Sequence, residues 1–205
     1  GPGAVGRSLE PSMEEALDDA IVSVWSAPTA GHSRFELWIA AGSLDGSAPL
    51  VAAVMAEIWA ARSGAEPWVT PSLTVLSLEG TKKELDAAVG KLLRAVTEPP
   101  REEELLAALE AVSDARARQQ RAPEREAIEA AFAAMGIDEA LPLGDDEDPA
   151  PSLDALAAYA NDAISLGRVR GLFIGEVDGA TVRSVERKLG ALDERPAARD
   201  RRQGR

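Results

Sequence analysis

The side chains that most often bind metals or carry out catalysis are scarce in this chain. Its 205 residues include one histidine, His32, and no cysteine. Protein zinc sites are built mainly from histidine nitrogen and cysteine sulfur, and catalytic thiolates come from cysteine. Composition alone therefore excludes a two-histidine zinc site, a disulfide and thiolate catalysis in this chain.

Carboxylates are the remaining candidates, and each has an ordinary structural explanation. The acidic run 145–148 could bind Ca²⁺, but it lacks the Asp-x-Asp-x-Asp-Gly order of an EF-hand loop, so we interpret it as a solvated loop. Glu57 could act as a base, yet without a metal or a second catalytic partner a glutamate on a helix surface is the better interpretation. His32 falls in a predicted turn and is interpreted as an exposed turn residue rather than a metal ligand. A hydrolase site of another kind is disfavoured, because the sequence has no nucleophile elbow and no glycine-rich phosphate loop.

Charge and hydropathy narrow the class of protein further. The formal net charge of −13 disfavours nucleic-acid binding, which needs clustered positive charge. No apolar stretch approaches the roughly 18 residues of a membrane-spanning helix. We expect a tag remnant and flexible lead-in at 1–19, one ordered domain at 20–192, and a disordered arginine-rich tail at 193–205. Because Gly1-Pro2-Gly3 resembles a cleavage scar, a trimmed signal peptide stays open, with a cytoplasmic location favoured.

Residues 33–62 predict a strand, a loop and a helix in succession. Along 34–41, apolar residues alternate with their neighbours as in a strand with one buried face. The stretch 42–47 is a loop by composition. Pro49 suits the first turn of a helix, and apolar residues then recur on one wide helical face. This helix should therefore lie flat on a sheet.

The remaining elements are predicted by the same patterns. Strands are predicted at 21–26, 73–78 and 169–174, and helices at 81–96, 102–120, 123–136, 152–164 and 182–189. The turn at 28–32 predicts a hairpin between the first two strands, and Pro67 and Pro71 indicate an edge or a bent entry before the third. Because helices and strands mix without strict alternation, the predicted class is α+β, with a mainly antiparallel sheet and helices packed on one face.

The order of these elements resembles a known family. The segment Leu37-Trp38-Ile39-Ala40-Ala41-Gly42-Ser43 and the helix after it resemble the strand, "AGS" turn and first helix of the insulinase/pitrilysin-type metallopeptidases, which include the mitochondrial processing peptidase subunits. Residues 73–96 resemble that family's next strand and helix, 102–118 its long "eEL" helix, and 172–178 the strand that introduces its closing helix. The similarity spans about residues 20–192 and implies an insulinase-like domain.

The resemblance also implies that this domain is noncatalytic. Active members carry H-x-x-E-H on the first helix, where two histidines bind zinc and the glutamate is the general base, together with a distant glutamate ligand. The matching turn here lies within 52–57, Ala-Ala-Val-Met-Ala-Glu, and holds no histidine in any register. We therefore expect no metal or other cofactor. Noncatalytic chains of this family are commonly paired with active ones, so the expected partner is an active metallopeptidase-like subunit or a second copy of this chain.

Five residues are candidates for contact with a partner or a peptide. Trp38 falls on the sheet face away from the predicted helices and is flanked by Arg34 and Glu36. In the family this face lines the chamber between two opposed domains. Val69 and Thr70 occupy, by the resemblance, the edge-strand region on which family members lay out a peptide by strand addition, although Pro71 removes one donor beside them. The alternative is a free-standing interaction or scaffold module that keeps only the fold.

Overall fold

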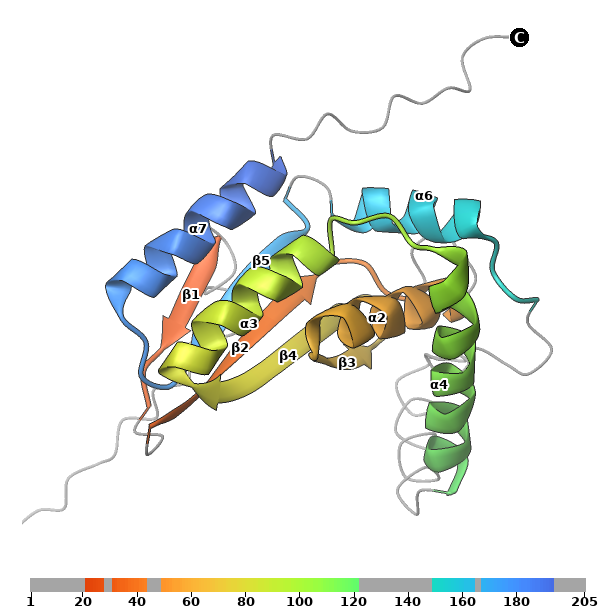
Figure 1. Cartoon of the computed structure of the whole chain (residues 1–205), viewed down its shortest axis with the longest axis horizontal. Coiled ribbons are helices and arrows are strands. Elements are labelled where there is room, and N and C mark those ends of the chain that lie inside the picture. The colour runs from red at the N-terminus through yellow and green to blue at the C-terminus, as the bar shows by residue number, and fades with distance from the viewer. Residues whose placement is uncertain (1–20, 28–30, 44–48, 122–148, 165–166, 194–205) are drawn as a thin grey trace, which may run out of the picture.

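The computed structural model describes residues 21–27, 31–43, 49–121, 149–164 and 167–193. Within these residues five strands form one sheet, and helices pack against one side of it (Figure 1). The strands are β1 (Val22–Trp25), β2 (His32–Ile39), β3 (Glu66–Val69), β4 (Thr74–Thr81) and β5 (Val169–Ile174). The helices are α2 (Pro49–Ser63), α3 (Lys82–Ala95), α4 (Glu102–Arg121), α6 (Leu153–Ala163) and α7 (Gly179–Asp193). None of these helices is long and apolar enough to cross a membrane.

The sheet has the strand order β1-β5-β2-β4-β3. β1 and β5 run parallel, and the other neighbouring pairs are antiparallel. The predicted α+β class with a mainly antiparallel sheet is therefore confirmed. The predicted hairpin between the first two strands is wrong, because β5 lies between β1 and β2. That pairing joins residues far apart in the sequence, such as Val22 and Gly171, so local turn residues carry no signal for it.

β2 is the central strand, and its alternation sets the two faces of the sheet. Phe35, Leu37 and Ile39 are fully buried, whereas the residues between them are half-buried on the opposite face. The buried face lies beneath α2, α3 and α7, of which α3 contacts β2 and β4, and α7 contacts β1 and β5. Gly171 of β5 gives the Phe35 ring its space, since a methyl group there would lie 3.1 Å from the ring.

α2 is enclosed on more sides than its predicted single apolar face requires. It contacts α3, β3 and β4, and α4 and α6 pack on it as well. Every residue from Leu50 to Ala60 is buried except Glu57. A helix that is apolar all round is a buried helix, and its alanines allow the neighbouring helices to approach closely. Trp59 of α2 packs its ring against Tyr159 of α6 with a centroid distance of 6.3 Å.

Two strand boundaries differ from the prediction. Residues around Pro67 were expected to form an edge or a bent entry to the next strand, because proline cannot donate a hydrogen bond to a neighbouring strand. They form a separate strand, β3, which accommodates the proline because it lies at one edge of the sheet. His32 is the first residue of β2, paired with Thr81, and not a turn residue. The helix predicted at 123–136, the acidic run 145–148 and the arginine-rich tail lie outside the described residues.

Candidate functional site: the open face of the sheet

The face of the sheet opposite the helices is uncovered within the described residues (Figure 1). Residues that oppose each other in neighbouring strands point to the same face, so the register identifies its members. Trp38 opposes Val75 of β4, which in turn opposes Trp68 of β3. At the other end, Arg34 opposes Ile174, which opposes Trp25 of β1. We call this surface the open face; it comprises Ser23, Trp25, Arg34, Glu36, Trp38, Glu66, Trp68, Val75, Ser77, Glu79, Arg170, Leu172 and Ile174, of which Val75 and Ser77 are buried among their neighbours.

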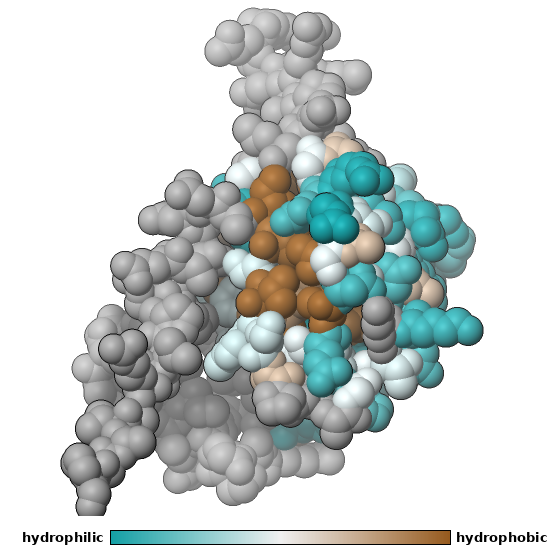
Figure 2. Space-filling model, turned by 90° about the vertical axis from the view of Figure 1, so that its left-hand side faces the viewer, coloured by the Kyte–Doolittle hydropathy of each residue, from teal (hydrophilic) through white to brown (hydrophobic). Residues whose placement is uncertain are grey.

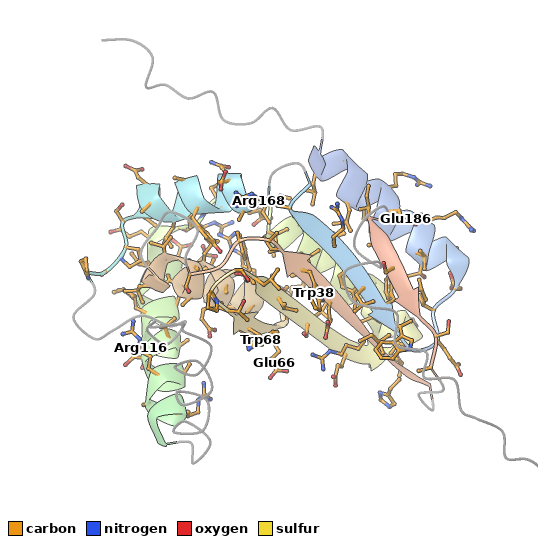
Figure 3. All side chains as sticks on the ribbon, turned by 180° about the vertical axis from the view of Figure 1, so that it is seen from behind. Trp38, Glu66, Trp68, Arg116, Arg168 and Glu186 are labelled. Carbon is orange, nitrogen blue, oxygen red and sulfur yellow. The ribbon has the colours of Figure 1, made fainter. Side chains whose placement is uncertain are left out.

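Three of the four tryptophans of the chain lie on the open face, and the fourth is the buried Trp59. Trp25 is 59% exposed and Trp68 is 60% exposed, whereas Trp38 between them is half-buried. Figure 3, seen from the side opposite to Figure 1, shows Trp38 and Trp68 on this face. Large apolar side chains gathered on one surface typically mark a contact site for another molecule, because exposing them to water is unfavourable.

A cross-strand polar network holds the centre of the open face. The indole N–H of Trp38 donates to Glu36 Oε2 at 2.8 Å, and the other carboxylate oxygen of Glu36 lies 2.8 Å from Arg34 Nε. The Arg34 guanidinium continues to β4, donating to Glu79 Oε1 and to Ser77 Oγ, each at 3.0 Å. The network ties the Trp38 ring to its neighbours in one orientation. A partner would therefore meet an ordered surface that loses little side-chain entropy on binding.

The structure brings three of the five predicted site residues together and leaves two apart. Arg34, Glu36 and Trp38 form one group, in which an ion pair joins Arg34 to Glu36 and a hydrogen bond joins Glu36 to Trp38. Val69 is buried, and the main-chain groups of Thr70 are already used: its N–H donates to Leu73 O at 2.8 Å and its carbonyl accepts from the Ser43 N–H at 3.1 Å. Strand addition at Thr70 would have to displace those bonds.

Sequence reasoning missed Trp25 and Trp68 as members of this surface. Trp25 belongs to a predicted strand, but its position beside Ile174 depends on the unpredicted pairing of β1 with β5. Trp68 belongs to a strand that was not predicted. The available signal was the number of tryptophans outside the predicted core, in a chain whose aromatic content is 4%.

The helix turn that matches the catalytic turn of active metallopeptidases is packed as core. Its residues 52–56 are all buried, and Glu57 beside them is half-buried. Burial raises the pKa of the Glu57 carboxyl, and the charge of Arg118 on α4 partly offsets this by lowering it. Across the described parts of the chain, no three histidine, cysteine, aspartate or glutamate residues gather where they could hold a metal ion. Residues 52–57 therefore serve the packing of α2 against its neighbouring helices.

Comparisons with known proteins give matches of fold only. No protein-family model and no curated protein sequence matches this chain. Among solved structures, the peptidase M16 inactive domain of Pseudomonas fluorescens is similar with a TM-score of 0.64 and 19% identity, covering 86% of this chain and 49% of that one. The periplasmic protease PqqL of Escherichia coli gives 0.70 and 12%, covering 88% and 24%. A chain of complex III from Candida albicans gives 0.59 and 14%, covering 85% and 44%.

These similarities cover 85–88% of this chain, which itself spans about half or less of each matched chain. The chain therefore has the insulinase-like fold of the M16 peptidases.

Proposed function

We propose that the chain is a noncatalytic M16-type domain that acts by binding a second protein domain through the open face. The observation that carries this proposal is the clustering of Trp25, Trp38 and Trp68 around the Arg34–Glu36 network on one uncovered sheet face. Tryptophan and arginine are the residues most enriched at the energetic centres of protein interfaces. The similarity to an M16 domain described as inactive supports a noncatalytic role.

The charge of the open face indicates which partner it suits. The open face carries two positive charges, on Arg34 and Arg170, and three negative charges, on Glu36, Glu66 and Glu79. It is therefore close to neutral in a chain of net charge −13. Interface centres are depleted in net charge and enriched in aromatic residues, as here. The suitable partner surface is apolar and nearly uncharged, as another sheet face of this fold would be. The matched chains are about twice as long or longer, so a second domain is the expected occupant, either an active metallopeptidase-like subunit or a further copy. Peptide binding by Val69 and Thr70 is a weaker expectation, because Thr70 uses its main-chain groups internally.

Substitution of Trp38 tests the proposal. We expect the chain, mixed with a full-length M16 peptidase from the same organism, to form a complex with it in sedimentation velocity. Trp38→Ala and Trp68→Ala should each weaken association by about tenfold or more, because central aromatic contacts contribute on the order of 2 kcal/mol. The matched control is Leu106→Ala, since Leu106 on α4 is 75% exposed and lies outside the open face.

Two outcomes would contradict the proposal. One is a wild-type chain that forms no complex with the M16 peptidase. The other is a Trp38→Ala chain that binds the M16 peptidase as tightly as wild type. Melting temperatures should be nearly equal for all variants, and a large drop for Trp38→Ala would show that the residue serves the monomer instead.

A further inference from the structure

Among the described residues, no strand pairs with the main-chain groups on the outer edge of β1. Gly171 donates its N–H to Ile21 O, and Gly175 donates to Trp25 O, both at 2.9 Å. Along a strand the N–H and C=O of successive residues point alternately to the two sides. Residues 21, 23 and 25 therefore face β5, and Val22 and Val24 direct their main-chain groups to the other side. Within the described residues no strand pairs there.

The two edges of the sheet differ in how well they resist pairing with another strand. At the β3 edge, Thr70 turns its N–H inward, so Pro67 is at an outward position and lacks a donor there. Glu66 in the same strand is exposed. The β1 edge has neither device, because residues 20–27 contain no proline, no glycine and no charged residue. Natural proteins usually protect free edges with prolines, charges or bulges, and an edge without them is suited to pairing.

Apolar side chains flank this edge on both faces of the sheet. Val24 is 43% exposed on the helix side, and Trp25 is 59% exposed on the open face. Figure 2, which shows the side of the molecule where β1 and α7 lie, has its apolar side chains gathered in one patch. The uncharged stretch 20–27 also allows close approach of two chains whose net charge is −13 each.

α7 runs beside β1 and carries one positive and one negative side chain on the same flank. Two antiparallel copies of this helix could therefore pair opposite charges. Arg183 and Glu186 are both exposed and lie three residues apart, hence on one side of the helix. Lys188 lies near Gly90 of α3, and the helical repeat of 3.6 residues puts Arg183 and Glu186 on the opposite flank. Figure 3 shows Glu186 on α7 beside β1. Neither residue forms an ion pair within the described chain.

We propose that two copies of this chain associate edge to edge through β1, antiparallel about a twofold axis at Ser23. Val22 of each copy opposes Val24 of the other, and each such pair exchanges two N–H···O=C bonds. The two sheets become one continuous sheet with all helices on the same side. The α7 helices then run antiparallel to each other, so that Arg183 of one copy and Glu186 of the other lie on facing flanks. A second copy is the occupant that fits, because β1 itself is the neutral, apolar strand that this edge requires.

This interface meets the open face only along its β1 border, at Trp25, and leaves Trp38 and Trp68 of both copies accessible. The proposal therefore does not depend on the proposed function. The two can be tested independently, because Trp38 and Trp68 lie away from the β1 edge.

Val24→Pro is the decisive variant. Proline removes the outward N–H at this position, while the bonds to β5 come from residues 21, 23 and 25 and stay intact. We expect the wild-type chain to dimerise in sedimentation velocity, and Val24→Pro to be monomeric with an unchanged far-ultraviolet circular dichroism spectrum. Val24→Ala, which keeps the N–H, is the matched control and should still dimerise. Trp38→Ala should leave this dimer intact.

A charge exchange provides a second test that does not alter the backbone. Glu186→Arg should weaken dimerisation, and Arg183→Glu combined with Glu186→Arg should restore it. This pair decides the question if Val24→Pro fails to fold. A wild-type chain that is monomeric over a wide concentration range would overturn the proposal. So would a folded Val24→Pro chain that dimerises like wild type, or a double variant that does not recover.

Discussion

Gly42 occupies a position where the backbone leaves no room for a side chain. A Cβ atom there would lie 2.3 Å from the Thr70 carbonyl oxygen and 2.6 Å from the Pro71 carbonyl carbon. The neighbouring Ser43 N–H donates to the same Thr70 oxygen at 3.1 Å, which holds the turn after β2 against the segment between β3 and β4. Glycine is therefore required by close approach of two backbone segments.

We predict that Gly42→Ala lowers the free energy of unfolding by about 1–3 kcal/mol, because backbone atoms must shift to relieve the contact. Urea denaturation of the two chains measures this. The control is Gly190→Ala within α7, where a Cβ would meet nothing within 4 Å; it should be neutral or stabilise by about 0.5–1 kcal/mol. Equal midpoints for Gly42→Ala and wild type would show that the turn can relax.

At the scale of elements, one arginine joins three helices. Arg62 in the last turn of α2 makes a two-pronged contact with Glu104 of α4, at 2.7 and 2.6 Å. Its guanidinium also donates to the carbonyl oxygens of Ala95 at the end of α3 and of Glu98 and Pro99 beyond it. Carbonyl groups at the end of a helix have no N–H partner within the helix. An arginine there donates hydrogen bonds to them, and its positive charge interacts favourably with the negative end of the helix dipole.

Glu104→Gln is predicted to destabilise the chain in a pH-dependent way. The Arg62 hydrogen bonds hold the pKa of Glu104 below its usual value of 4.5, against a smaller opposite effect of burial. A carboxyl whose folded pKa is lowered stabilises the fold fully above the unfolded pKa and loses that contribution as the pH falls through the folded pKa. At neutral pH we expect a loss of about 2 kcal/mol.

The difference between Glu104→Gln and wild type should shrink steadily below pH 4.5. Denaturation at neutral and acidic pH measures it. Glu103→Gln is the control. Glu103 is exposed, its single ion pair with Arg101 is long at 3.8 Å, and exposed ion pairs contribute little to stability. A loss of stability that does not depend on pH would contradict the prediction. It would indicate that the glutamine amide fits poorly beside Arg62 and that the lost charge is not the cause.

At the scale of the whole molecule, α2, which occupies the position that the sequence resemblance gives to the zinc-carrying helix of active metallopeptidases, is the most enclosed of the described helices. Its residues 52–56 are alanine, valine and methionine, which are all buried, and the helix contacts the sheet, α4 and α6. Introducing two imidazoles there would place polar groups among apolar ones, which is unfavourable without a ligand.

We predict that the purified chain holds no stoichiometric zinc and cleaves no peptide, because one histidine and no cysteine cannot provide a zinc site of the usual kind. Elemental analysis after dialysis and a fluorogenic peptide assay test this. His32→Ala should change neither result, since His32 is an exposed residue at the start of β2. One zinc per chain, or chelator-sensitive peptidase activity that persists through repurification, would contradict the prediction.

Local patterns in the sequence predicted those features that depend on neighbouring residues. Alternation along β2 predicted which of its side chains are buried, and hence the face on which Trp38 lies. The segment from strand to glycine turn to helix predicted the start of α2 at Pro49. The same reading indicated the insulinase-like fold that the structural comparisons support. Each of these depends on the period of a strand or helix, which a short stretch of residues is enough to specify.

The strand neighbours and the composition of the open face were decided only by the tertiary structure. β5 lies in the sheet between β1 and β2. β3 forms one edge of the sheet, although its Pro67 argued against a strand there. These pairings bring Trp25 and Trp68 onto the face that Trp38 occupies. They are made by main-chain hydrogen bonds, for which every residue has an acceptor and every residue but proline a donor, so side-chain identity barely encodes which strands meet. Burial of the shared core selects among the possible pairings, and that selection requires the whole chain.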